Sequence, residues 1–184
     1  MPTNVTTPNT FLQRLIGAVS LDAAIYEEVE ADRGATGQAL AVVLLSSLAA
    51  GIGARGLGGD SPSNIAFISV VALLAWAAWA LLTFQIGGRL MPEPQTQVDV
   101  GELLRTIGFA STPGLLRVFG ILPGVTIPVF AVTAVWMLAA MIVAVRQALD
   151  YTSTGRAIAV CVLGWALALA FAVGIGLLFG PTVS

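Results

Sequence analysis

The chain contains no histidine and no lysine, and it has a single cysteine. Without imidazole, a histidine general base, a serine–histidine dyad, His-ligated zinc and His-ligated haem are all excluded. The lone Cys161 permits no internal disulfide and no cysteine cluster for a metal, and we interpret it as a small buried hydrophobe. The sequence therefore predicts no catalytic site, no metal site and no cofactor.

Charge is also scarce in this sequence. Only 10% of the 184 residues are charged, 57% are hydrophobic, and the mean hydropathy is +0.92. Soluble domains carry about 25% charged residues, so this composition indicates a membrane protein. The longest polar stretch, residues 1–35, is too short for an independent core. We expect one compact membrane bundle, without a second soluble domain and without a nucleic-acid partner.

Five stretches are apolar over the length needed to cross a membrane. At about 1.5 Å rise per residue, each reaches roughly 28–35 Å, against a hydrocarbon core of about 30 Å. Lipid cannot hydrogen-bond a bare backbone, so each stretch is predicted to be a helix. The predicted spans are residues 36–54, 65–86, 103–122, 125–145 and 157–179. The predicted fold is an all-α polytopic bundle (36–184) preceded by a leader with one or two short amphipathic helices (1–35).

The leader has the periodicity of amphipathic helices. One apolar stripe, with Gln13 and Arg14 opposite it, comprises Phe11, Leu12, Leu15, Ile16 and Val19. Ser20 is predicted to cap a second helix, with Asp22 in its first turn. That second helix is acidic, so anionic lipid would repel it. We expect it to pack on the inner face of the bundle, where four arginines are available, and a solvated acidic face is the alternative. These arginines are Arg89, Arg105, Arg146 and Arg156.

The placement of arginine predicts the orientation. With the N-terminus inside, six arginines fall at the inner face, whereas Arg55 and Arg117 fall outside. The inner six are Arg14, Arg33, Arg89, Arg105, Arg146 and Arg156. We therefore expect a cytoplasmic N-terminus and an external C-terminus in a plasma or inner membrane. The arginine-only, Ala/Gly/Val-rich composition suggests a prokaryotic source.

The third predicted span carries the most unusual residues. Pro113 has no N–H for the carbonyl of Phe109, so the helix should kink or split there. Arg105 and Arg117 are each expected to snorkel toward the nearer membrane boundary. A broken helix with a charge can form a transport site, but no Asp or Glu lies inside any span. We favour a structural kink and keep a transport site as the alternative.

Two further patterns concern helix packing and helix ends. Small residues recur every four positions in the fifth predicted span, at Gly164, Ala168, Ala172 and Gly176. Such spacing lets helices approach closely, within one chain or between two copies. Arg146 and Asp150 stand four apart and are predicted to form an ion pair at a helix end.

Three stretches resemble a known family. They are residues 11–32 (FLQRLIGAVSLDAAIYEEVEAD), 108–124 (GFASTPGLLRVFGILPG) and 143–157 (VAVRQALDYTSTGRA). Together they resemble the prokaryotic branch of the Yip domain family, named for Ypt/Rab-interacting proteins. The resemblance implies a cytosolic N-terminus, five spans and an external C-terminus. It implies no biochemical activity for particular residues, and the vesicle-traffic role of eukaryotic relatives is not transferred.

The function expected from these features is not enzymatic. We predict an integral membrane protein that organises the membrane or serves as an accessory subunit, through helix–helix and inner-face contacts. Its partners would be the lipid bilayer and either another membrane protein or a second copy of itself. The alternative is a small transporter or channel that uses the third span broken at Pro113.

Overall fold

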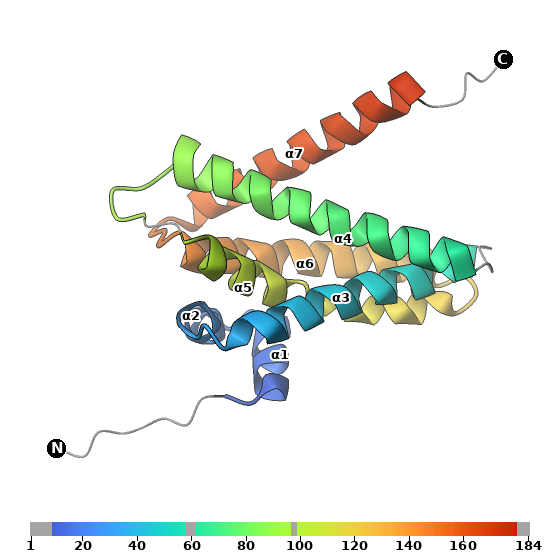
Figure 1. Cartoon of the computed structure of the whole chain (residues 1–184), viewed down its shortest axis with the longest axis horizontal. Helices are drawn as coiled ribbons and strands as arrows, with labels where there is room; N and C mark the ends of the chain where they lie inside the picture. The colour runs from blue at the N-terminus through green and yellow to red at the C-terminus, as the bar shows by residue number, and fades with distance from the viewer. Residues whose placement is uncertain (1–8, 58–61, 97–98, 180–184) are drawn as a thin grey trace.

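The computed structural model describes residues 9–57, 62–96 and 99–179, with side chains described through Leu167. This part of the chain is helical and contains no strand, as the all-α prediction required. The long helices run along the molecule, and two short ones lie across one end (Figure 1). In chain order the helices are α1 (Phe11–Val19), α2 (Ala23–Ala31), α3 (Ala35–Gly53), η1 (Ala54–Leu57), α4 (Pro62–Gln85), η2 (Ile86–Leu90), α5 (Val100–Ala110), η3 (Thr112–Ile121), α6 (Thr126–Ala148) and α7 (Thr154–Phe179).

Three helices in the described residues are long and apolar enough to cross a membrane. They are Ala35–Leu57, Pro62–Leu90 and Thr126–Ala148, and they match the first, second and fourth predicted spans. Helix α7 has 26 residues over the fifth predicted span. Because its side chains are described only to Leu167, its apolar length within the described residues is shorter. The total of five spans therefore stays a prediction.

The third predicted span is not one continuous α-helix. Helix α5 ends at Ala110, and the chain continues as the tighter 3₁₀ helix η3. Pro113 causes this break because it cannot donate to the carbonyl of Phe109. The hydroxyl of Thr112 donates to that carbonyl instead, at 2.5 Å, and the hydroxyl of Ser111 donates to Ile107 O at 3.3 Å. The predicted split is thus present, and hydroxyl groups replace the lost backbone donor.

Glycines permit η3 to pack very closely on α3. A Cβ atom on Gly53 would lie 1.9 Å from the carbonyl oxygen of Arg117, and one on Gly114 would lie 2.1 Å from Ser46 Oγ. Only a residue without Cβ fits at such a crossing. After η3 the chain turns at Gly124, with φ at +79°, and α6 returns along η3. This confirms that the third and fourth predicted spans are antiparallel neighbours.

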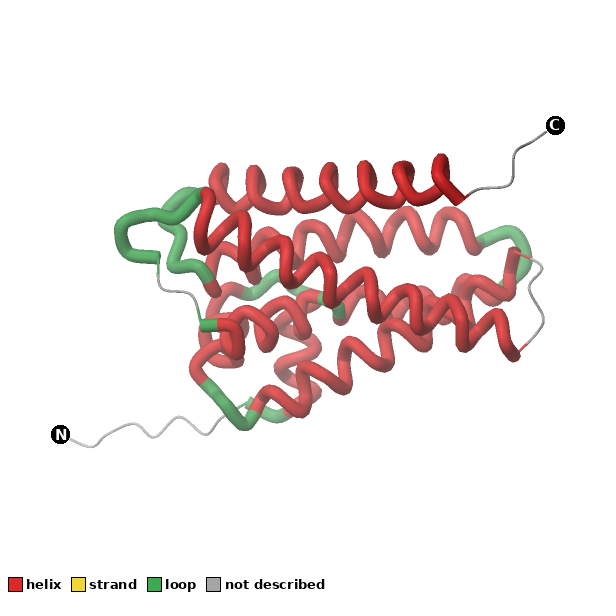
Figure 2. The backbone as a smooth tube through the Cα atoms, turned by 45° about the horizontal axis from the view of Figure 1, so that its top comes forward, coloured by secondary structure: helices red, strands yellow, loops and turns green. Residues whose placement is uncertain are grey.

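Helices α1 and α2 form a cap, defined here as residues 11–31, over one end of the bundle (Figures 1 and 2). Helix α1 begins with a reciprocal capping box between Thr10 and Gln13. It ends at Ser20, after which Leu21 adopts a left-handed φ of 62°. Asp22, whose side chain accepts from the N–H of Ala24 at 3.0 Å, then caps α2. The prediction of Ser20 as this cap was wrong, because Ser20 belongs to the turn that ends α1.

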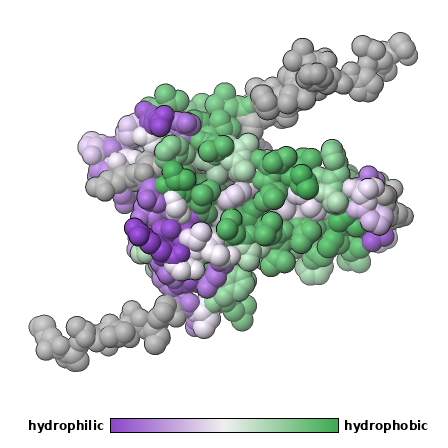
Figure 3. Space-filling model, viewed as in Figure 1, coloured by the Kyte–Doolittle hydropathy of each residue, from purple (hydrophilic) through white to green (hydrophobic). Residues whose placement is uncertain are grey.

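The core lies beneath the cap, between α2, α5 and α6. Its largest fully buried side chains include Tyr26, Phe109, Leu103 and Leu149. Around the long helices the surface is apolar instead, with side chains such as Phe67 and Leu74 exposed. Figure 3 shows hydrophilic residues gathered at the cap end, a smaller hydrophilic group at the opposite end and a hydrophobic belt between them. An apolar belt between polar ends is the surface expected of a bundle that crosses a bilayer.

Candidate functional site

A buried arginine fixes the cap in place. Arg14 of α1 is only 2% exposed. Its guanidinium donates to Glu28 from Nε at 3.0 Å and from Nη2 at 2.8 Å, to Asp32 at 2.7 Å and to Gln38 at 3.0 Å. One side chain therefore ties α1 to α2 and to the start of α3. The sequence pattern had placed Arg14 on the polar face of this helix, opposite the apolar stripe, but the structure buries it.

Two further donors attach the carbonyl ends of the cap helices to the bundle. Arg105 of α5 is 5% exposed and donates from Nε to the carbonyls of Val29 (3.0 Å) and Glu30 (3.1 Å). Trp136 of α6 donates from its indole nitrogen to Val19 O at 2.8 Å. The last carbonyls of a helix have no partner within the helix, so both contacts satisfy groups that burial would otherwise leave unpaired. Arg105 thus points into the cap and does not snorkel.

The cap carries carboxyl groups with opposite pKa shifts. Burial alone would raise the pKa of Glu28, but hydrogen bonds from Asn9 and Arg14 outweigh it and lower that pKa. Hydrogen bonds from Arg14 and from the N–H of Gly34 lower the pKa of Asp32. Among the residues that the structure describes, none donates a hydrogen bond to the carboxyl group of Glu30. Its burial, with the nearby carboxylates of Asp150, Glu102 and Glu27, raises its pKa to about 7.

A second polar cluster joins the loops after η2 and α6. The buried carboxylate of Glu93 accepts from the N–H and the hydroxyl of Thr152, at 3.0 and 2.8 Å. Arg156 pairs with Glu93 at 3.4 Å and donates to Pro92 O at 2.8 Å. The hydroxyl of Tyr151 donates to the carbonyls at Gly87 (2.9 Å) and Met91 (2.8 Å). These contacts hold the two loops against each other at the cap end.

The predicted helix-end pair of Arg146 and Asp150 is not formed. Helix α6 ends at Ala148, and Asp150 lies beyond it in a left-handed conformation, with φ at 51°. The N–H groups of Asp150 and Tyr151 bond back to the carbonyls of Gln147 and Arg146, which is the Schellman type of helix ending. Because Asp150 is outside the helix, four-residue spacing does not bring it to Arg146, whose Nε donates to Tyr151 O at 3.3 Å.

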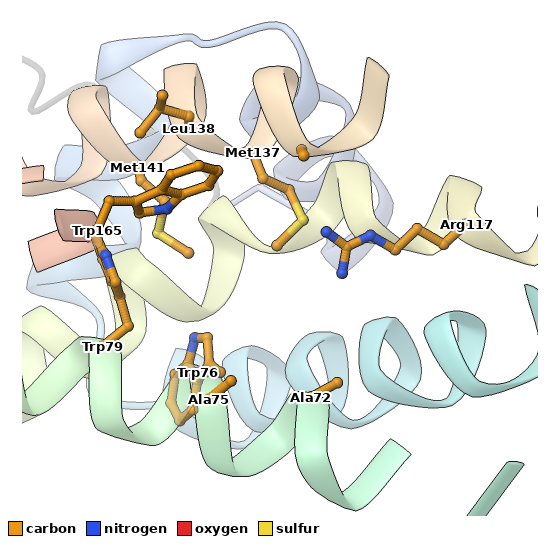
Figure 4. A pocket seen from close by; sticks show the side chains of 10 residues that line it. Ala72, Ala75, Trp76, Trp79, Arg117, Met137, Leu138, Met141 and Trp165 are labelled. Atoms are coloured by element: carbon orange, nitrogen blue, oxygen red, sulfur yellow. The ribbon is translucent and has the colours of Figure 1, made fainter. Parts of the chain in front are cut away.

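The bundle contains a cavity of about 380 Å³ whose one charged lining residue is Arg117. Its walls come from α4, η3, α6 and α7 and are otherwise apolar or aromatic. Arg117 of η3 and Trp76 of α4 both point toward this space, as Figure 4 shows. The guanidinium lies 5.4 Å from the centre of the Phe130 ring, and its Nε donates to Thr133 Oγ1 at 3.4 Å. The cavity is lined by Ala72, Ala75, Trp76, Trp79, Arg117, Ala134, Met137, Leu138, Met141 and Trp165.

The inward direction of Arg117 differs from the boundary anchor that the sequence suggested. Its side chain extends toward Met137 and into the bundle (Figure 4). The carbonyl of Arg117 lies against α3 at Gly53, while its side chain contacts Phe130 and Thr133 of α6. The candidate residues therefore fall into two groups. Arg105, Arg146 and Asp150 lie at the cap end, while Pro113 and Arg117 lie on η3.

The small residues of the fifth predicted span are only partly within the described side chains. Gly164 of α7 faces Trp79 of α4, because a Cβ atom on Gly164 would lie 3.3 Å from the indole nitrogen. That contact is intramolecular, between helices that pack in the bundle. Ala168, Ala172 and Gly176 lie outside the residues whose side chains are described.

The comparison with protein families found a family model that covers most of the chain. The model of the Yip1 domain matches residues 22–175, from the start of the cap's second helix into α7. The chain belongs to the Yip1 domain family. Family membership and the apolar helices together indicate a multi-pass membrane protein. No curated protein and no solved structure matches the chain significantly.

Sequence reasoning missed two further features of this Yip1-family protein. One is the burial of Arg14, whose signal was the pair of acids four residues apart at the end of the next helix, Glu28 on α2 and Asp32 directly after it. The other is the close crossing of α3 and η3, where Gly53 and Gly114 are the small residues at the contact. In the described residues, no group of three or more His, Cys, Asp or Glu side chains is placed to hold a metal ion.

Proposed function

We propose that this Yip1-family protein is a non-enzymatic membrane protein that organises the membrane or serves as an accessory subunit, through contacts made at its cap. One observation carries the proposal. The cap is held rigidly by buried hydrogen bonds, yet it exposes Leu12 by 65% and Ile16 by 58%. Apolar side chains four apart on a helix form one strip. A fixed strip of this kind suits contact with a second helix.

The position of the strip supports this proposal. Helix α1 lies across the long helices at the cap end, where the hydrophilic surface meets the apolar belt (Figures 1 and 3). Arg14 faces the bundle from the same helix, so the strip is held outward while the charge is turned inward. A partner membrane protein, or a second copy of this chain, could cover Leu12 and Ile16 without disturbing the ion pairs.

The proposal includes an orientation. The arginine distribution favours a cytoplasmic cap end, an external C-terminus and five spans in the plasma or inner membrane of a prokaryote. Arg14 and Arg156, each paired with a carboxylate, both belong to the cap end in this scheme. Partners would therefore meet the cap from the cytoplasmic side of the bilayer.

Photo-crosslinking tests the cap as a contact surface. A photoreactive amino acid is placed at Leu12 or Ile16 in the full-length protein in its native membrane, and at exposed Glu27 of α2 as a matched control. We expect Leu12 and Ile16 each to give one protein adduct of defined mass, and Glu27 to give far less. Adducts with lipid alone at both strip positions would reject the proposal.

The cavity favours a second candidate, a small transporter or channel that uses the third span broken at Pro113. The observation behind it is that Arg117, three residues after the buried Gly114, faces the cavity between α4, η3, α6 and α7. Flux of an anion through reconstituted vesicles, abolished by Arg117→Gln in a protein that still folds, would establish this candidate. Absence of such flux, together with defined adducts at Leu12, favours the accessory role.

A further inference from the structure

The cavity beside Arg117 continues in two directions that differ in chemistry. On one side lies a small space of about 30 Å³, which shares Arg117 with the large cavity and adds three serines to its lining. These serines are Ser46, Ser47 and Ser111, all at most 7% exposed. On the other side, an apolar crevice of about 230 Å³ between α6 and α7 shares Leu138 and Trp165 with the cavity. A polar recess, a charge and an apolar channel are thus contiguous.

The polar groups that face this space are hydrogen-bond donors in need of acceptors. In the described part of the chain, the buried indole nitrogens of Trp76 and Trp79 have no hydrogen-bond partner, and that of Trp79 lies beside Gly164 of α7. Among the described residues, no carboxylate pairs with Arg117, and its only hydrogen bond is the long one from Nε to Thr133. A buried donor left unsatisfied is costly, and in lipid no bulk water can replace its partner. An acceptor with negative charge would give Arg117 the partner that no carboxylate in the described residues provides.

The rest of the cavity lining is apolar and would contact the apolar part of a ligand. Met137, Met141, Leu138 and Trp165 present thioether, aliphatic and aromatic surface, and unbranched methionine adapts to flexible apolar ligands. The volume of about 380 Å³ lies in the range of small-molecule sites, about 300–1,000 Å³. The crevice between α6 and α7 extends this apolar surface without adding a polar group. Such a lining fits a hydrocarbon chain.

We propose that this cavity binds an acyl chain that carries an oxyanion head group, with the head group on Arg117 beside the serine recess. The chain would lie past Trp76 and Met141 and leave between α6 and α7. A fatty-acid carboxylate and the phosphate of an anionic phospholipid share this chemistry. The binding site is independent of the cap contacts under Proposed function, so either can fail alone.

Tryptophan quenching tests the site, because three of the four tryptophans line it. The full-length protein in phosphatidylcholine nanodiscs is titrated with brominated palmitate, with brominated phosphatidylglycerol and, as a head-group control, with the brominated C16 alcohol. We expect saturable quenching by at least one anionic probe. The alcohol should bind at least about tenfold more weakly than that probe. Whichever anionic probe saturates identifies the source of the ligand. Equal binding of the alcohol, or no saturation by either anion, overturns the proposal.

Variants separate the charge from the shape of the cavity. Arg117→Gln should weaken binding of the anionic probe about tenfold. Arg33→Gln, on the exposed surface, should leave this binding unchanged. Ala134→Leu fills the cavity without removing a polar group, so it should also block quenching by the probe. This variant still tests the proposal if Arg117→Gln does not fold. Inorganic phosphate should not compete with the brominated probe at equal concentration. Full binding in both cavity variants, or displacement by phosphate alone, contradicts the proposal.

Discussion

Arg14 and Glu28 are joined by two hydrogen bonds to one carboxylate oxygen, at 3.0 Å from Nε and 2.8 Å from Nη2. The two residues lie on different helices, and Arg14 is almost fully buried while the Glu28 side chain is 25% exposed. The same guanidinium reaches Asp32 at the end of α2. Since both helices are only nine residues long, they would be marginal in isolation. This shared arginine makes the cap a fixed part of the bundle.

The first prediction concerns Arg14. Arg14→Gln should destabilise the docked cap by about 2 kcal/mol, because it leaves two partly buried carboxylates without their cation. Hydrogen exchange of the α1 and α2 amides in nanodiscs measures this. Arg33→Gln, at an exposed position just beyond α2, should leave the exchange unchanged.

The pH dependence of the same variant follows from the lowered pKa values of Glu28 and Asp32. A carboxyl group with a lowered folded-state pKa stabilises above its unfolded pKa and loses that contribution as pH falls through the folded value. The deficit of Arg14→Gln should therefore be full at pH 7 and shrink below about pH 4. A deficit that is the same at both pH values would mean that Arg14 acts by packing alone.

The second prediction concerns the glycine contact between α3 and η3. Gly53→Ala should destabilise the bundle by about 3 kcal/mol or more, because the new methyl group would overlap the carbonyl of Arg117. Gly37→Ala, in the same helix, meets nothing within 4 Å and should be neutral or stabilise by up to about 1 kcal/mol. Thermal unfolding of both variants in detergent gives the comparison. Similar unfolding temperatures for the two would show that the close crossing is wrong.

The third prediction concerns Glu30. Its folded-state pKa of about 7 lies above the unfolded value, so the folded state holds a proton that the unfolded state has released. The free energy of unfolding should thus fall by about 1 kcal/mol, after allowance for solvent screening, as pH rises from about 4.5 to about 7. Above that pH it should level off. Burial of the carboxyl group is the main cause of the raised pKa, and the carboxylates of Asp150, Glu102 and Glu27 add to it while Arg105 opposes it.

Glu30→Gln should remove this fall in stability, as read from hydrogen exchange of the α2 amides between pH 5 and pH 8 with correction for the intrinsic exchange rate. Glu27→Gln, which changes an exposed carboxyl group on the same helix, should keep most of it. If Glu30→Gln shows the same slope as the unchanged protein, the Glu30 carboxyl group is not the one that titrates.

The long helices and the break at Pro113 could be read from the sequence because both depend on local chemistry. An apolar run in lipid has no alternative to a helix, and proline removes a backbone donor wherever it stands. The cap of α2 was predicted two residues too early, because the end of α1 and the start of α2 share the same short turn. Leu21 takes the left-handed position there, which local propensity disfavours.

The burial of Arg14 and the inward direction of Arg117 could not be read from periodicity. Both depend on which distant groups the fold brings near, and an arginine can bury its charge where carboxylates or an aromatic face meet it. Arg14 finds two carboxylates, while Arg117 finds the Phe130 ring and an apolar cavity. Helical spacing places each side chain on a face of its own helix but says nothing of the partner.

The central claim, that this bundle crosses the membrane with its cap end in the cytoplasm, is tested most directly by cysteine accessibility. Ser153→Cys probes the exposed loop after α6 near the cap end, and Leu57→Cys probes the opposite end, where Leu57 is 66% exposed. The native Cys161 is buried, so it contributes little background. We predict that a membrane-impermeant maleimide labels Leu57→Cys in intact cells and Ser153→Cys only after the membrane is opened. Labelling of both from the same side would contradict the account.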